Sequence, residues 1–152
     1  MPLGRGQKFP ALSLRGTGGE TEPLLGRIPR VVILGHRDCK TTRQTLPYVD
    51  RMHRRVPGAS LAVLQDEPEV ARALARDLDL ALPILIEPAP YKAAEALGVT
   101  AVPTLFLIGP DGLVEDVSEG FSRSHLEGFA EALSVPLPLF DPEDRSPAFR
   151  PG

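Results

Sequence analysis

The clearest structural signal in the chain is the stretch Val31-Val32-Ile33-Leu34-Gly35-His36-Arg37-Asp38-Cys39-Lys40. Its first four residues are aliphatic and mostly β-branched, which is typical of a strand buried on both faces of a parallel sheet. Gly35 ends this run, and the apolar positions of residues 40–55 then follow a helical period. The sequence therefore predicts a central strand, a short polar loop and a helix, with the only cysteine of the chain in the loop.

The elements around this stretch alternate between strands and helices. An edge strand is expected at residues 9–14, before a glycine-rich turn, and further strands at residues 59–64, 83–86, 104–108 and 113–117. Helices are expected at residues 67–77, 91–97 and 122–133. This order predicts an α/β fold with a mixed, mostly parallel central sheet and helices on both faces.

The length of 152 residues suits one domain, which we place at residues 1–134. Residues 135–152 are rich in proline and show no periodicity, so they are interpreted as a tail that is frayed or bound to the surface. No apolar run is long enough to span a membrane, and the start lacks the apolar core of a signal peptide. No membrane contact and a cytoplasmic location are therefore expected.

The composition argues against several classes of function. Basic residues are concentrated in the first third of the chain, but no nucleic-acid motif accompanies them and aromatic residues make up only 5%. One cysteine excludes an intramolecular disulfide and a metal site made of cysteines alone, and the three histidines are scattered. There is no glycine-rich phosphate loop. We therefore expect no nucleic-acid partner, no metal and no cofactor.

Cys39 is the candidate for chemistry because it follows a central strand and stands at or just before a helix start. Sites form at the carboxyl ends of strands in open α/β sheets, and a helix N-terminus favours the thiolate. The neighbouring positive side chains add to this effect, whereas Asp38 opposes it; the positive residues are Arg37, Lys40, Arg43 and, when protonated, His36. The alternative is that Cys39 is a small buried apolar residue.

His36 allows two interpretations. It lies three residues before Cys39 in the same loop, where it could act as a base or polarise a bound substrate. It could equally satisfy hydrogen bonds at the end of the strand. Both alternatives remain open from the sequence.

Three segments together resemble the thioredoxin-like superfamily, in particular its TlpA/ResA and AhpC/TSA-type branch. They are Phe9-Pro10-Ala11-Leu12-Ser13-Leu14, then Cys39-Lys40-Thr41-Thr42-Arg43 with Pro47, and Gly98-Val99-Thr100-Ala101-Val102-Pro103-Thr104-Leu105-Phe106-Leu107-Ile108 with Asp111-Gly112. The resemblance covers about residues 9–133. It implies a thioredoxin-like fold with an N-terminal β-hairpin extension and Cys39 in the position of the nucleophile. It also implies a cis Val102–Pro103 bond beside the sulfur, where Pro103 shapes a groove and Val102 offers backbone hydrogen bonds to an extended peptide.

Two positions depart from the pattern of that family. Thr42 stands where a resolving cysteine is usual, and Asp38 stands where a tryptophan usually precedes the nucleophile. The site is therefore a monothiol, Cys39-x-x-Thr42. A threonine hydroxyl can hydrogen-bond a thiolate, but it cannot release a mixed disulfide as a second cysteine does. An external thiol must regenerate Cys39.

These residues predict a monothiol thiol–disulfide oxidoreductase with Cys39, Thr42 and Pro103 at its centre, and a disulfide substrate and an external thiol as partners. One alternative is a one-cysteine peroxidase of the peroxiredoxin kind, an antioxidant acting on a peroxide. That family has a threonine three residues before its cysteine and an arginine before its late strand, where this chain has His36 and Pro103. The other alternative is a non-catalytic binding module of the same fold. The sequence predicts no oligomeric state.

Overall fold

The computed structural model describes residues 1–152, which form nine strands and four helices. The strands are β1 (Ser13–Gly16), β2 (Thr21–Pro23), β3 (Arg30–Gly35), β4 (Ser60–Leu64), β5 (Ile84–Ile86), β6 (Thr104–Ile108), β7 (Val114–Glu119), β8 (Phe121–Ser122) and β9 (Phe149–Arg150). The helices are α1 (Lys40–Arg55), α2 (Pro68–Asp77), α3 (Lys92–Ala96) and α4 (Arg123–Ala132). None of these helices is both long and apolar enough to cross a membrane.

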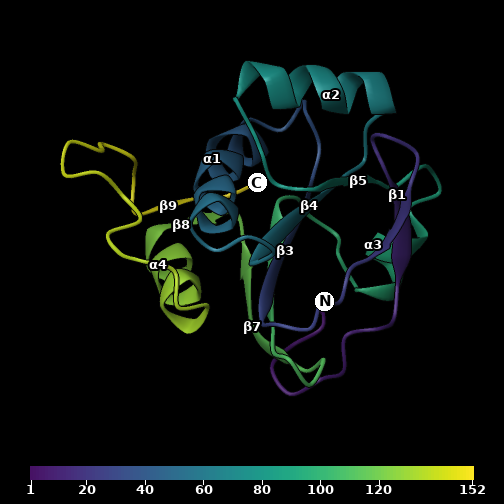
Figure 1. The fold of residues 1–152 in the computed structure, drawn as a ribbon, viewed down its shortest axis with the longest axis horizontal. Coiled ribbons are helices and arrows are strands. Elements are labelled where there is room, and N and C mark those ends of the chain that lie inside the picture. Colours follow the sequence, from purple (N-terminus) through teal and green to yellow (C-terminus); the bar gives the residue numbers. More distant parts are fainter.

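Seven strands form one sheet in the order β2-β1-β5-β4-β3-β6-β7. Figure 1 shows β1, β5, β4, β3 and β7 of this sheet. The strands β5, β4 and β3 are parallel neighbours, while β1, β6 and β7 join the sheet through antiparallel pairing. Following these pairings across the sheet, the five strands β2, β3, β4, β5 and β7 run in the same direction. The predicted mixed, mostly parallel sheet is therefore confirmed.

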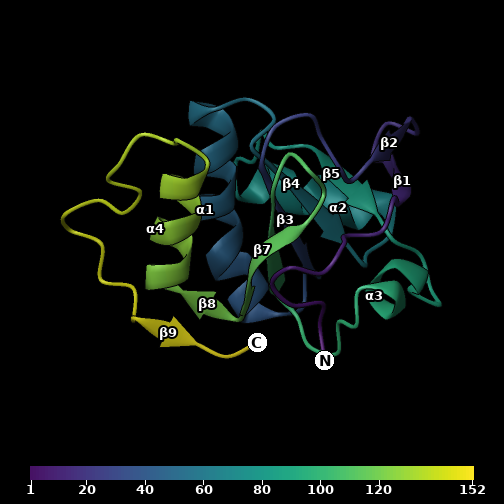
Figure 2. The ribbon, with the colours of Figure 1, turned by 90° about the horizontal axis from the view of Figure 1, so that it is seen from below.

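Helices cover both faces of the sheet, as predicted (Figures 1 and 2). Successive residues of β3 point to opposite faces, so that Val31 and Ile33 belong to the larger apolar cluster and Val32 and Leu34 to the smaller one. Residues of α1, α2 and α4 complete the larger cluster, whereas α3 and N-terminal residues complete the smaller one. The two-sided burial explains why the sequence of β3 shows no polar alternation.

The N-terminal β-hairpin extension is confirmed, but its first strand begins later than predicted. β1 begins at Ser13, pairs with β2 and joins the sheet beside β5. Phe9 is fully buried outside any strand: its amide donates a hydrogen bond to Gly112, and its ring meets Phe106 edge-on at 5.7 Å between centroids. Burial of this ring against the sheet fixes the segment before β1, so the alternating pattern there reflects packing rather than strand pairing.

The expectation of a frayed or merely surface-bound tail is wrong for its first part. Val135, Leu139 and Phe140 are buried within the larger apolar cluster. Further along, β9 pairs in antiparallel orientation with β8, immediately before α4. Although a domain boundary after residue 134 stays a prediction, the core does not end there, because three tail side chains complete it. Prolines between these apolar residues remove the periodicity that would have revealed them.

Candidate functional site

Cys39 lies at the junction between β3 and α1, where it is the N-cap residue of the helix. Its backbone is extended, and its sulfur accepts a hydrogen bond from the amide of Thr42 at 3.4 Å. Serine, threonine, asparagine and aspartate usually fill this position with an oxygen acceptor. A sulfur there faces the free amide groups and the positive end of the helix dipole, which favour a negative charge on it. Cys39 is only partly buried and is free, which disfavours the alternative of a buried apolar residue.

The segment before β6 brings a second part of the chain to the sulfur. The Val102–Pro103 peptide bond is cis, as the resemblance implies. The Cys39 thiol donates a weak hydrogen bond to the carbonyl oxygen of Val102, at 3.5 Å from the sulfur. This approach follows from the antiparallel pairing of β3 with β6, which places the end of one strand beside the beginning of the other. Three of the predicted site residues, Cys39, Val102 and Pro103, therefore lie in one place.

Thr42 lies beside Cys39, but its hydroxyl does not have the role expected from the sequence. The side chain is fully buried, and its oxygen has no hydrogen-bond partner. It points at β3 instead: a Cβ added at Gly35 would lie 2.7 Å from that oxygen. The backbone amide of Thr42, and not its hydroxyl, contacts the sulfur. The glycine thus makes room for Thr42, and the residue supports the site through its amide and its packing.

The positive side chains near Cys39 differ in whether an acidic side chain balances their charge. Arg37 is paired with Asp38, with 3.2 Å between the guanidinium and the carboxylate, so its charge is largely balanced within the loop. Lys40 and Arg43, in the first turn of α1, are exposed and have no side-chain partner. The uncompensated positive side chains near the sulfur therefore belong to α1 and not to the loop.

His36 lines a pocket of about 590 Å³, although Cys39 itself does not line it. Gln65, Tyr91, Ala101 and Val102 also line this pocket, so it borders the backbone that approaches the sulfur. The His36 ring is partly buried and has no hydrogen bond, while its backbone carbonyl accepts one from the amide of Cys39 at 3.2 Å. The alternative in which the ring satisfies hydrogen bonds at the strand end is therefore not observed. The ring is available to a bound molecule.

One part of the site escaped sequence-based reasoning. Residues 149–152, named here the terminal segment, run from β9 to the start of α1 and to Val102. The Thr41 hydroxyl donates a hydrogen bond to the carbonyl of Pro151 at 2.7 Å. No local pattern could have shown this, because the contact joins residues 110 positions apart in the sequence.

The comparisons with known proteins concern the fold. No family model matches the sequence, and no curated protein matches it. Among solved structures, the chain is similar to the thioredoxin domain of a thiol-disulfide oxidoreductase from Bacteroides vulgatus, with a TM-score of 0.75 and 15% identity over 86% of this chain and 97% of that one. A thiol:disulfide interchange protein of the thioredoxin family from Chlorobium tepidum has a TM-score of 0.69 and 17% identity, over 85% and 97% of the two chains.

A third similar structure is a secreted disulfide oxidoreductase of Mycobacterium tuberculosis, with a TM-score of 0.67 and 15% identity, over 81% of this chain and 96% of that one. The match covers nearly the whole of each neighbour, although few residues are identical. The architecture and the neighbours agree with the fold that the sequence motifs imply. The chain has a thioredoxin fold, in which Cys39 stands at the start of α1 and faces the cis Val102–Pro103 bond.

Proposed function

We propose that this protein is a monothiol thiol–disulfide oxidoreductase with Cys39 as its nucleophile. The observation that carries the proposal is the position of the Cys39 sulfur, which accepts the Thr42 amide at 3.4 Å and lies 3.5 Å from the Val102 carbonyl. The first contact favours the thiolate, which is the reactive form. The second places the sulfur beside the backbone of Val102, along which an extended substrate can lie.

The reaction is a thiol–disulfide exchange in two steps. The Cys39 thiolate attacks one sulfur of a disulfide R–S–S–R′, forming Cys39–S–S–R while R′S⁻ leaves and takes up a proton. A thiolate R″S⁻ from solution then attacks the sulfur of R, which yields R–S–S–R″ and frees the Cys39 thiolate. The chain has no second cysteine to perform this step. The cycle therefore consumes one external thiol for each thiol that it releases.

The surrounding residues have supporting roles in this cycle. The amide of Thr42 and the first turn of α1 stabilise the thiolate of Cys39. Lys40 and Arg43 give the entrance a positive field that attracts an anionic thiol. His36, which lines the adjacent pocket without a hydrogen bond, can donate a proton to the departing sulfur. Pro103 and the Val102 backbone shape the groove.

The decisive test is the catalysis of disulfide exchange by the native protein and by Cys39→Ser. Serine can still accept the Thr42 amide as an N-cap, so the variant loses the sulfur while keeping the helix start. We expect the native protein to accelerate the reduction of a small disulfide by an external thiol, and the variant to have no effect. If hydrogen peroxide oxidises Cys39 faster than any disulfide does, the protein is a peroxidase instead. If both reactions are slow, it is a non-catalytic module.

The remaining expectations from the sequence are not addressed by this site. A cytoplasmic location stays a prediction, as do the absence of nucleic-acid and membrane partners and the identity of the regenerating thiol.

A further inference from the structure

We propose that the terminal segment is a built-in ligand of the groove beside Cys39, by which we mean the Val102 backbone and the first turn of α1 on either side of the sulfur. An extended substrate must displace this segment to reach the thiol. The inference rests on the proposed function, because it concerns access to the same sulfur. It assigns to residues 149–152 an autoinhibitory contact. The occupant is a stretch of this chain that the structure shows in place.

The terminal segment is held by backbone pairing in a two-stranded ladder of β8 and β9, which is separate from the seven-stranded sheet. Phe149 and Arg150 of β9 face Ser122 and Phe121 of β8 in antiparallel register, and the amide of Arg123 donates a hydrogen bond to Ala148 at 3.0 Å. Pairing of an extended segment with a strand through backbone hydrogen bonds is also a common mode of peptide recognition, because backbone groups supply the affinity. The strand leads directly to the residues around the sulfur.

The end of the segment contacts both sides of the site. On the side of α1, the hydroxyl of Thr41 donates to the carbonyl of Pro151 at 2.7 Å. On the other side, a Cβ added at Gly152 would overlap the Val102 carbonyl oxygen, the same atom that accepts from the Cys39 thiol. The segment therefore lies against the backbone that an extended substrate would use. Figures 1 and 2 both place this end of the chain beside the start of α1.

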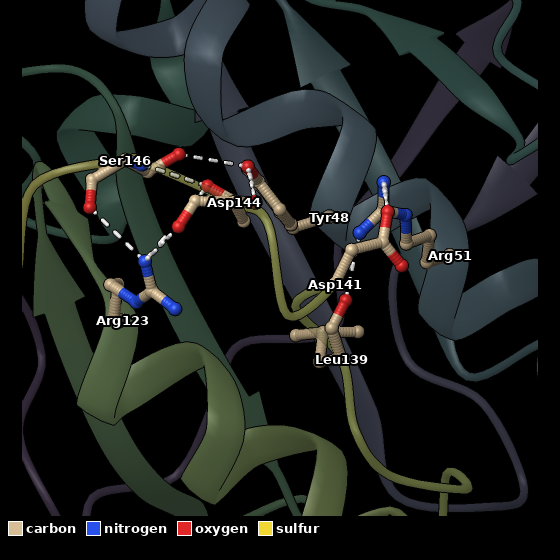
Figure 3. Close-up of polar contacts among 7 residues, drawn as sticks. All are labelled: Tyr48, Arg51, Arg123, Leu139, Asp141, Asp144 and Ser146. Carbon is tan, nitrogen blue, oxygen red and sulfur yellow. Dashed lines mark hydrogen bonds and ion pairs between the residues drawn. The ribbon is translucent and has the colours of Figure 1, made fainter.

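A polar cluster fixes the chain just before the terminal segment (Figure 3). The hydroxyl of Tyr48 donates a hydrogen bond to the carboxylate of Asp144 at 2.5 Å, and the amide of Ser146 donates to the same carboxylate at 2.8 Å. Arg123 donates to the carbonyl of Ser146 at 3.1 Å. A strand tethered this closely to its groove has a high effective concentration there, so weak contacts are enough to keep it bound.

The terminal segment can nevertheless leave without opening the core. All four of its residues are exposed, and the Phe149 side chain keeps 59% of its accessible surface. Apart from the hydrogen bond between Arg150 and Gln44 at 3.1 Å, its described polar contacts are made by the backbone. Segments with little buried apolar area open locally at small cost in free energy. Displacement by a substrate is therefore a local event.

The experiment compares the rates at which two thiol reagents modify Cys39, which is the only cysteine of the chain. The first is iodoacetamide, which is small enough to pass beside the segment. The second is an extended peptide whose cysteine is joined in a disulfide to 5-thio-2-nitrobenzoate; attack by the Cys39 thiolate forms the Cys39–peptide disulfide and releases the coloured thiolate. The chains are the native protein, a chain ending at Ala148, and the full-length variant Arg150→Pro, which removes an amide from β9.

We expect both altered chains to react with the peptide at least about tenfold faster than the native protein. If the segment occupies the groove about nine-tenths of the time, only about one-tenth of the native chains can react at any moment. Their rates with iodoacetamide should change less than about twofold, because both groups that contact the sulfur, the Thr42 amide and the Val102 carbonyl, are kept. The exposed Glu143→Gln lies outside the segment and serves as a matched control that should behave as the native protein does. Arg150→Ala keeps the amide of β9 and loses only the exposed hydrogen bond to Gln44, so it should raise the peptide rate less than Arg150→Pro does.

An unchanged ratio of the two rates in both altered chains would overturn the proposal. This readout is independent of catalysis. If the opened chains react faster with the peptide but no chain turns over a disulfide with an external thiol, the built-in ligand stands and the proposed function fails. If turnover is observed while the ratio stays constant, the proposed function stands and the built-in ligand fails.

Discussion

Two parts of the C-terminal tail are held in different ways. In residues 135–146, named here the anchor segment, the side chains of Val135, Leu139 and Phe140 are buried, and Asp144 lies in a network with Tyr48. The terminal segment, by contrast, is exposed and is held through β9 and single hydrogen bonds. The anchor segment contributes to the stability of the fold, whereas the terminal segment contributes little to it and lies on the site.

The contrast shows how one stretch of chain can serve two purposes. Buried rings and a carboxylate network fix where the tail runs, and the fixed position delivers a weakly bound strand to the groove beside Cys39. A strand that was itself part of the core could not be displaced by a substrate, because its release would cost several kcal/mol. Substitutions in the two segments should therefore differ sharply in their effect on unfolding.

The largest effect on stability is expected from Phe140→Ala. The Phe140 ring lies 4.4 Å from the ring of Tyr48 and packs edge-on against Phe121, while the guanidinium of Arg123 lies 4.3 Å above it. Its removal leaves a cavity and should lower the free energy of unfolding by about 3–5 kcal/mol in urea titration. The matched control is Phe149→Ala in the terminal segment, where the ring is exposed and we expect a loss below about 0.5 kcal/mol. Equal losses for the two variants would remove the distinction between the segments.

A smaller effect is expected from Tyr48→Phe, which deletes one hydroxyl and keeps the ring. The hydroxyl donates to the Asp144 carboxylate and also lies 3.0 Å from the hydroxyl of Ser146. Losing a hydrogen bond to a charged group should cost about 1.5–3 kcal/mol, measured by the same titration. Tyr91→Phe is the control, because Tyr91 is exposed and its hydroxyl has no partner. If Tyr48→Phe left the free energy of unfolding unchanged, the network would not hold the anchor segment.

The pH dependence of stability tests the same carboxylate. Hydrogen bonds from the hydroxyls of Ser146 and Tyr48 and from the Ser146 amide, together with the charge of Arg123, lower the pKa of Asp144 to about 2. Because the pKa is lower in the folded state, the stabilisation is complete above the ordinary pKa of an aspartate, about 3.9, and is lost as the pH falls from there towards 2.

The native protein should therefore lose stability over that range of pH, and Asp144→Asn should lose less of it. Asp141→Asn, at an exposed carboxylate 3.8 Å from Arg51, is the matched control and should follow the native curve. Parallel curves for the native protein and Asp144→Asn would contradict the role of this carboxylate. Thermal unfolding followed by circular dichroism at a series of pH values gives the comparison directly.

A small effect on stability is also expected from the loss of the whole terminal segment. A chain that ends at Ala148 loses no buried side chain, so its free energy of unfolding should fall by less than about 1 kcal/mol. Urea titration of this chain beside the native protein measures the difference. A loss as large as that of Phe140→Ala would show that the segment belongs to the core, and that its displacement by a substrate is too costly.

Local patterns in the sequence were sufficient for most of the fold and for the position of Cys39. The apolar run of β3 and the helical period after it place the cysteine at a helix start, because these features depend on neighbouring residues alone. The cis bond before Pro103 could be expected only from the resemblance to a family, since most bonds of this type are trans.

The features that could not be predicted depend on residues far apart in the sequence. The Thr42 hydroxyl turns to Gly35, which is a consequence of how α1 packs on β3. The burial of Phe140 and the pairing of β9 with β8 join the tail to residues that precede it by many positions. No periodicity or turn motif in the tail records these contacts, because prolines interrupt it and the partners lie elsewhere.

The nucleophilic role of Cys39 is tested most directly by the rate at which the native protein forms a mixed disulfide with hydroxyethyl disulfide at neutral pH, a reagent small enough to pass beside the terminal segment. Mass spectrometry follows the adduct, and a short peptide with the sequence of residues 37–43 provides the reference thiol. We predict a faster reaction for the protein than for the peptide, with one adduct on each chain that persists until an external thiol is added. A rate no higher than that of the peptide would contradict the assignment of Cys39 as an activated nucleophile.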